Sequence, residues 1–112
     1  MIRVLLLTLF VLAGCSAAPA ETPAAPEAPT GPLVLRLSVD EASPHRVEVA
    51  RGRVVELTVT SREPAEVHVH GFDVLAAARD GEPAELRFTA DRTGTFDVEA
   101  HPDTLLVQLV VR

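Results

Sequence analysis

From residue 33 to the end, the chain is a succession of short segments in which apolar and polar residues alternate. The alternation is cleanest in Arg46–Val49 and Val54–Thr60, and no segment of this part repeats apolar residues with a helical period. Alternation with a period of two predicts strands that bury one face and expose the other. Glycine and proline residues fall between the segments, where they favour turns. We expect strands at Leu33–Val39, Arg46–Val49, Val54–Thr60, Glu66–Phe72, Ala84–Thr89, Gly94–Ala100 and Leu105–Val111.

Seven short strands at this spacing predict an all-β protein, a Greek-key β-sandwich of antiparallel strands. The stretch Val74–Arg79 has helical propensity but only six residues, so we expect a connection or a poor strand there. Residues 33–112 number 80, which is near the lower limit for a chain that builds its own core. They are expected to form one domain.

The first fourteen residues have the pattern of an export signal. Arg3 precedes the apolar run Val4–Leu12, which is shorter than the roughly 20 apolar residues that a membrane-spanning helix needs. Residues 1–14 are therefore predicted to be a signal peptide. The run ends in Leu12-Ala13-Gly14-Cys15, which resembles the lipobox of bacterial lipoproteins. That resemblance implies cleavage before Cys15 and attachment of lipid to its thiol.

Two other interpretations of this segment are an ordinary signal peptide followed by a chance cysteine, and an anchor that is not cleaved. The lipoprotein interpretation is favoured because Cys15 stands where the apolar run stops and the chain has no other cysteine. It predicts a protein of the cell envelope that is attached to the membrane through lipid. Ser16 rather than Asp follows the cysteine, and by analogy with enteric lipoproteins this favours the outer membrane, facing the periplasm, in a Gram-negative host.

After the lipid-bearing cysteine, the segment 15–32 is predicted to be a linker. Residues 16–32 contain five prolines, and most of the others are Ala, Thr and Glu. Such a composition cannot bury a core and favours an extended chain. At about 3.1 Å per residue, this linker would hold the domain up to roughly 50 Å from the membrane.

Charge and composition exclude several classes of function. The chain has 16 acidic residues, 10 arginines and no lysine, for a net charge of −6. It therefore lacks the basic stripe that a nucleic-acid partner requires. Its single cysteine excludes an intramolecular disulfide. Because neither a nucleophile in a recognisable order with a histidine and an acid nor a glycine-rich phosphate loop occurs, we do not expect an enzyme.

The order of motifs along residues 33–112 resembles that of the cupredoxins. His70-Gly71-Phe72 is similar to the His-x-Phe segment that carries the first copper ligand of that family. Gly94-Thr95-Phe96 is similar to the segment that leads to the ligand cysteine, and Pro44–Val59 and Leu106–Val111 match other strands. The resemblance implies a cupredoxin-like β-sandwich, although a fold does not by itself carry a site.

The sequence departs from this family at the copper ligands. A blue-copper centre takes two histidines, one cysteine thiolate and a weak axial methionine. Here the cysteine position falls on Ala100, no methionine follows it, and the loop at 101–104 is too short for the usual ligands. The ligand inventory therefore excludes electron transfer of the blue-copper kind.

Three of the four histidines offer a different metal site. His68 and His70 are two residues apart on one expected strand, so both rings project from the same face. The cupredoxin resemblance places the strand with Glu99 and His101 beside this one. Three nitrogen ligands and one oxygen suit Cu(II) or Zn(II) rather than Cu(I), which prefers sulfur. We expect a non-enzymatic module that binds or hands over such a metal.

The alternation also presents a difficulty for this site. If Ala100 faces the core, then Glu99 and His101 lie on the opposite face of their strand. His70 shares a face with Phe72, so a buried Phe72 would direct His70 toward Ala100 and away from His101. The four ligands would then meet only if the chain turns after Ala100.

The alternative is a metal-free domain that docks onto another envelope protein. In that case the ring of His70 bonds to a loop carbonyl, as buried histidines usually find a hydrogen-bond partner. The apolar segment Leu105–Val111 would then be either a central strand or an edge that awaits a partner. His45 follows a proline and is expected in a turn.

Overall fold

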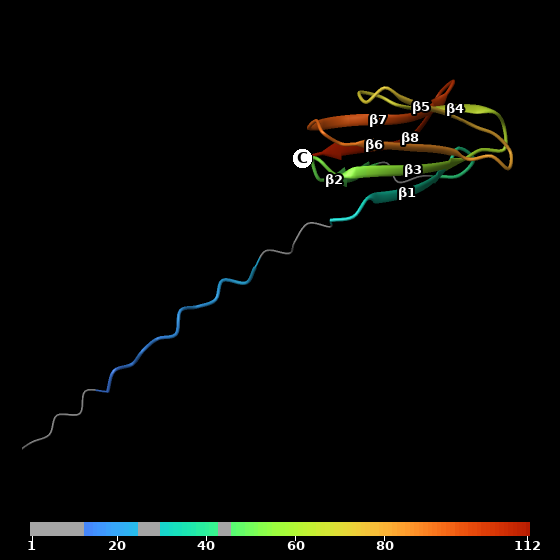
Figure 1. Ribbon diagram of the computed structural model, residues 1–112. Helices are drawn as coiled ribbons and strands as arrows, with labels where there is room; N and C mark the ends of the chain where they lie inside the picture. Colours follow the sequence, from blue (N-terminus) through green and yellow to red (C-terminus); the bar gives the residue numbers. More distant parts are fainter. Residues whose placement is uncertain (1–12, 25–29, 43–45) are drawn as a thin grey trace, which may run out of the picture.

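The computed structural model describes residues 13–24, 30–42 and 46–112 (Figure 1). All regular secondary structure in this part of the chain is strand, so the prediction of an all-β protein is confirmed. The strands are β1 (Leu33–Ser38), β2 (Arg46–Val49), β3 (Val54–Thr60), β4 (Ala65–Val69), β5 (Val74–Ala78), β6 (Ala84–Thr89), β7 (Gly94–His101) and β8 (Thr104–Val111).

The strands form two sheets that face each other as a sandwich (Figure 1). The strand order is β1-β3-β6 in one sheet and β2-β8-β7-β4-β5 in the other. Four of the six strand pairs are antiparallel, as expected, but β1–β3 and β2–β8 are parallel. Two parallel neighbouring strands must be joined by a crossover connection. Between β1 and β3 the chain crosses to the opposite sheet, where it forms β2, and then returns.

Two stretches that the sequence left ambiguous are strands of the larger sheet. Val74–Ala78, expected to be a connection or a poor strand, is β5 and pairs with all five residues of β4. Alanine is a poor strand former, so this strand depends on its neighbour and on the packing of Val74 and Ala76 against the core. Strand β8 lies between β2 and β7, so the segment Leu105–Val111 belongs to a central strand and not to an edge strand.

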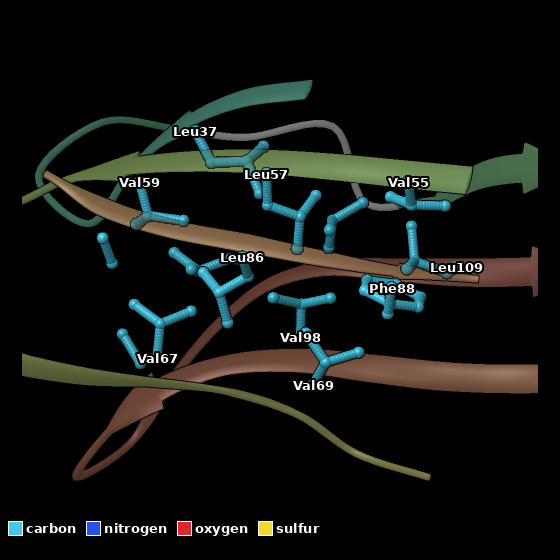
Figure 2. Close-up of a cluster of buried hydrophobic side chains, with 14 of the residues drawn as sticks. Leu37, Val55, Leu57, Val59, Val67, Val69, Leu86, Phe88, Val98 and Leu109 are labelled. Atoms are coloured by element: carbon cyan, nitrogen blue, oxygen red, sulfur yellow. The ribbon is translucent and has the colours of Figure 1, made fainter. Parts of the chain in front are cut away.

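Apolar side chains, most of them aliphatic, fill the space between the two sheets (Figure 2). Leu57, Val67, Val98 and Leu109 are among the fully buried members of this core. Within the described residues, Ser61 is the only polar residue that is buried, and its hydroxyl donates a hydrogen bond of 2.5 Å to the Glu63 carbonyl. The interior of the sandwich is therefore apolar throughout the described part.

The N-terminal segments lie outside this core. Residues 13–24 and 30–32 are exposed and carry no helix or strand, whereas every buried residue of the described chain lies between Leu37 and Val111. No helix in the described ranges is long and apolar enough to cross a bilayer. The predicted signal peptide falls mostly on residues 1–12, which are outside the described residues. The buried core of the described chain therefore lies wholly within the strand-forming part that begins at Leu33.

Replacement of Leu57 by alanine tests this placement of the core. Leu57 is 1% exposed and Leu75 is 56% exposed, so the two leucines are a matched pair. We expect Leu57→Ala to lower the free energy of unfolding of the segment 30–112 by about 2–5 kcal/mol, because it leaves a cavity. Leu75→Ala should cost less than about 0.5 kcal/mol. Urea unfolding of the two variants measures both values, and equal losses would contradict the placement.

Candidate functional site

The pairing of β4 with β7 decides which side chains of these strands face solvent. His68 pairs with Glu99, and Glu66 pairs with His101. The residues between them point into the sandwich, where Val67, Val69, Val98 and Ala100 are all buried. Because side chains alternate along a strand, His68, Glu99 and His101 project from the outer face of the five-stranded sheet. The expected placement of Glu99 and His101 opposite the core is confirmed.

The four residues predicted as metal ligands lie together on this outer face, and we call them the histidine cluster. The ring centroid of His68 is 4.2 Å from that of His70 and 5.9 Å from that of His101. The Nε2 atom of His70 is 3.0 Å from the Oε2 atom of Glu99, a hydrogen-bond distance. Two positions on or next to β4 and two on β7 thus contribute to one cluster.

The direction of His70 differs from the expectation. The strand was predicted to continue to Phe72, with His70 and Phe72 on one face. Instead β4 ends at Val69, and the next residues form a turn in which Gly71 has φ +84°. This left-handed conformation breaks the alternation, so His70 stays on the outer face with His68 while Phe72 packs against the core. The idea that a buried Phe72 would direct His70 toward Ala100 is therefore wrong.

Aromatic packing holds this turn in place. The Phe72 ring lies 4.8 Å from the Phe88 ring and 4.6 Å from the Phe96 ring, measured between centroids. The Arg92 guanidinium lies over the Phe72 ring at 5.1 Å, a cation–π contact. On the other side of the turn, the backbone N–H of His70 donates a hydrogen bond of 2.9 Å to the Asp97 carbonyl. The position of His70 thus depends on packing at both sides.

The cluster is open to solvent. The side chains of His70 and Glu99 are 44% and 36% exposed, His101 is exposed, and His68 is half-buried. A polar contact between two side chains of this exposure contributes little to stability. The contact between His70 and Glu99 is therefore weak enough to be exchanged for a ligand.

In the observed side-chain positions, the donor atoms are not arranged as in a metal site. Within the described residues, no three His, Cys, Asp or Glu side chains are grouped as a bound metal would require. Two imidazoles on one tetrahedral zinc have ring centroids about 5 Å apart, from a Zn–N distance of about 2.0–2.1 Å. The observed separations of 4.2 and 5.9 Å lie on either side of this value. A shared ion would therefore require the rings to move, and their nitrogen atoms to turn toward it.

The interior of the sandwich does not fit a copper ion. Ala100, in the position where the cupredoxin resemblance requires a cysteine, is 1% exposed and belongs to the apolar core. Cys15 is exposed and lies in the N-terminal segment 13–24. In the described part of the chain the core contains no nitrogen or sulfur ligand and no carboxylate.

Two leucines beside the cluster were missed by the sequence analysis. Leu75 on β5 pairs with His68, and Leu105 on β8 pairs with Glu99, so both share the outer face. Leu75 was missed because its stretch lacks the alternation that marks a strand. The remaining histidine, His45, is outside the described residues.

Comparison with known proteins found similar solved structures, but no related sequence family. A scan against protein-family models and a search of curated proteins each found no match. Among solved structures, a copper-binding protein determined by NMR in its apo form has a TM-score of 0.61 and 15% identity, over 77% of this chain and 93% of that one. Auracyanin A, a blue copper protein from the green thermophilic photosynthetic bacterium Chloroflexus aurantiacus, has a TM-score of 0.59 and 14% identity, over 73% of this chain and 100% of that one.

Oxidase subunits share the same fold. The periplasmic domain of cytochrome oxidase subunit II from Bradyrhizobium japonicum has a TM-score of 0.56 and 15% identity, over 75% of this chain and 86% of that one. A chain of a heme-copper terminal oxidase has a TM-score of 0.54 and 17% identity over 74% of this chain, which spans only 65% of that chain. At these identities the likeness establishes a cupredoxin-like fold, and it does not establish an activity.

Substitution of Gly71 tests whether its close contact with Phe96 constrains the turn that follows β4. A Cβ atom at Gly71 would lie 2.5 Å from Cδ1 of Phe96, whereas one at Gly52 would meet nothing within 4 Å, although its φ of +87° is similar. We expect Gly52→Ala to cost about 1–2 kcal/mol for the left-handed backbone alone. Gly71→Ala should cost clearly more, because the Phe96 ring must also move. Urea unfolding compares them, and equal costs would show that the contact with Phe96 is unimportant.

Proposed function

We propose that this chain is an envelope lipoprotein whose cupredoxin-like domain binds one Cu(II) or Zn(II) ion on its outer sheet face, without catalysis. The observation that carries the proposal is the gathering of three imidazoles and one carboxylate, from His68, His70, His101 and Glu99, on one solvent-exposed surface. Such a module would buffer the metal or hand it to another envelope protein.

The donor set suits these two metals. Imidazole nitrogen and carboxylate oxygen are borderline and hard ligands, which Zn(II) and Cu(II) accept and Cu(I) does not prefer. When bound, the ion would be held by imidazoles from His68, His70 and His101, with Glu99 as oxygen donor. The exposed side chains of this face can change rotamer on a picosecond-to-nanosecond timescale, so the required turn of the rings is accessible. Copper binding by proteins of the same fold adds support.

The position of the cluster favours a binding role over an enzymatic one. Three cavities of about 270 to 380 Å³ are formed by other parts of the sandwich, and none of them is lined by a member of the histidine cluster. A metal at the cluster would therefore lie outside these three cavities. The apolar interior also supports the view that this domain does not carry a blue-copper electron-transfer site.

Anchoring through Cys15 is the second part of the proposal. Cys15 is exposed, and the surrounding residues 13–24 are exposed and without regular structure, which leaves the thiol accessible for modification. With signal peptide 1–14 removed, the linker 15–32 would connect the lipid to β1. We infer a location in the cell envelope, and in a Gram-negative host on the outer membrane facing the periplasm.

A metal-free interaction domain is the second candidate. It is favoured by the exposed side chains of Leu75 and Leu105, which are 56% and 48% accessible, and by the hydrogen bond that already pairs His70 with Glu99. In this case the outer face would bind another envelope protein directly.

Calorimetric titration of Cu(II) and Zn(II) into the segment 30–112 distinguishes the two candidates. We expect one ion per chain with submicromolar affinity, and loss of binding in the triple variant His68→Ala, His70→Ala, His101→Ala. Glu99→Gln should weaken binding by about tenfold or more. Circular dichroism of each variant checks that the strands are retained.

His45→Ala is the matched control, because the sequence places this histidine in a turn away from the His-x-His pattern. It should bind metal like the wild type. Weak or multi-site binding that survives the triple substitution would rule out the metal site and favour the interaction domain.

Expression of the full chain in a bacterial host tests the anchor. Mass spectrometry of protein extracted from membranes should find a chain that begins at residue 15 and carries acyl groups on Cys15. Cys15→Ser should remove the modification and the cleavage, whereas Ser16→Ala should leave both intact. An unmodified Cys15 in the wild-type protein would refute the anchoring proposal.

A further inference from the structure

One end of the sandwich is the place where the N-terminal linker joins the domain. The Nε atom of Arg53 donates a hydrogen bond of 2.9 Å to the carbonyl of Gly31, just before β1. Arg112 lies at the same end (Figure 1), and its carbonyl accepts a hydrogen bond of 2.9 Å from the backbone N–H of Arg51. The loop between β6 and β7 joins them, because the N–H of Ala90 donates to the Arg53 carbonyl at 2.9 Å. We call residues 31, 50–53, 90–93 and 112 the linker end.

Arginines are concentrated at the linker end. Its two loops, 50–53 and 90–93, contain Arg51, Arg53 and Arg92. They contain one carboxylate, that of Asp91, so three positive charges against one negative charge give these loops a side-chain charge of +2. The C-terminal arginine pairs with Glu48 at 3.3 Å, and this pair adds no net charge. The linker end is therefore positive, although the chain as a whole carries −6.

The three loop arginines have neutral partners in the described part of the chain. Arg51 and Arg53 each donate through Nε to a backbone carbonyl, at 3.3 and 2.9 Å. The Arg92 guanidinium lies over the rings of Phe72 and Phe96, 5.1 and 5.8 Å from their centroids. None of the ion pairs between described residues involves these three arginines. Such contacts orient a guanidinium without cancelling its charge, and a bond through Nε leaves the terminal nitrogen atoms able to bind a phosphate.

The opposite end of the sandwich is acidic. One cavity there is lined by four carboxylates, those of Asp40, Glu41, Asp80 and Glu82. Both arginines of this cavity, Arg62 and Arg79, form ion pairs with carboxylates of the same cavity. Strand β3 connects the two ends with 7 residues, so about 23 Å lie between them, at about 3.3 Å per residue. The domain therefore has a positive linker end and a negative far end.

An anionic membrane acts mainly on the end of the domain that is nearest to it. Anionic headgroups attract an arginine close to the surface, and this attraction falls off within a Debye length, about 8 Å at physiological ionic strength. When the linker end touches the surface, the carboxylates of the far cavity lie more than two Debye lengths away. A few arginines attract too weakly to hold a free domain, but a tether keeps the domain near the surface at a high local concentration.

We propose that the linker end is a docking surface for the anionic headgroups of the membrane that carries the lipid anchor. This inference rests on the anchoring through Cys15 proposed above, because the linker joins the domain at the docking end. The loops with Arg51, Arg53 and Arg92 contact lipid phosphates, and the strands rise away from the surface. The histidine cluster then stays on a side of the domain that other envelope proteins can reach.

Neutron reflectometry of the chain 15–112, coupled through its cysteine to a maleimide lipid in a supported bilayer, tests the docking. Cys15 is the only cysteine, so the coupling site is unique. We expect the protein density to touch the headgroups when the bilayer contains about 30% phosphatidylglycerol in phosphatidylcholine. The density should move outward on phosphatidylcholine alone, and also in about 0.5 M salt, which shortens the Debye length.

Two double variants locate the docking surface. Arg51→Gln, Arg92→Gln should lower the ratio of docked to undocked protein at least about tenfold, because it removes two charges from the contact. Arg62→Gln, Arg79→Gln is the matched control, since it removes the same charge from the far end and should dock like the wild type. Arg53 is left in place because its hydrogen bond holds the linker. Circular dichroism checks that both variants retain the strands.

Three outcomes would overturn the docking surface. Wild-type density that stays equally far from both bilayers would do so, and would leave an acidic protein as the candidate partner of this end. Equal losses in the two double variants would show that net charge, and not the linker end, controls the approach. Docking that neither salt nor the neutral bilayer weakens would show that headgroup charge is not recognised. Chemical coupling replaces lipidation here, so a failure of the anchoring proposal is seen separately, in the mass spectrum of the expressed chain.

Discussion

The antiparallel pairing of β4 with β7 is the interaction on which the candidate site depends. Its register sets Val67 opposite Ala100 in the core and His68 opposite Glu99 on the outer face. The two-residue period that buries the valines thus exposes the imidazole and the carboxylate. A slip of one residue would carry His68 and Glu99 into an apolar interior, and burial of such groups without partners costs several kcal/mol. The core therefore holds the histidine cluster in place, although no cluster residue belongs to it.

In this molecule the proposed metal site lies outside the interior of the cupredoxin-like sandwich. The β-sandwich is cupredoxin-like, yet Ala100, at the position where the sequence resemblance implies the ligand cysteine, is buried in the apolar core. The proposed donors lie on the outer side of the same two strands, where solvent and a second molecule can reach them. This arrangement suits exchange of a metal better than tuning of a redox potential, because an exposed ion keeps contact with water. It also illustrates why a fold predicts architecture more securely than chemistry.

Much of the structure could be predicted from local pattern, and the exceptions have physical causes. Alternation located β3 and β6 without error, because each has one buried face. The same rule placed Glu99 and His101 opposite the core. The alternation rule gave the wrong direction for the side chain of His70, because the pattern of apolar and polar residues does not indicate the left-handed turn at Gly71. It also failed at β5, whose alanines form a strand only through pairing with β4, and it could not reveal the two parallel pairs, which depend on connections across the sandwich.

X-ray absorption at the zinc edge, on the segment 30–112 loaded with one equivalent of Zn²⁺, tests the central claim most directly. The account predicts a first shell of nitrogen and oxygen at about 2.0–2.1 Å, with the scattering pattern of three imidazoles and no sulfur. His68→Ala should remove one imidazole from that pattern. A shell of oxygen alone, or a spectrum unchanged in the variant without His68, His70 and His101, would contradict the claim that the outer sheet face is a metal site.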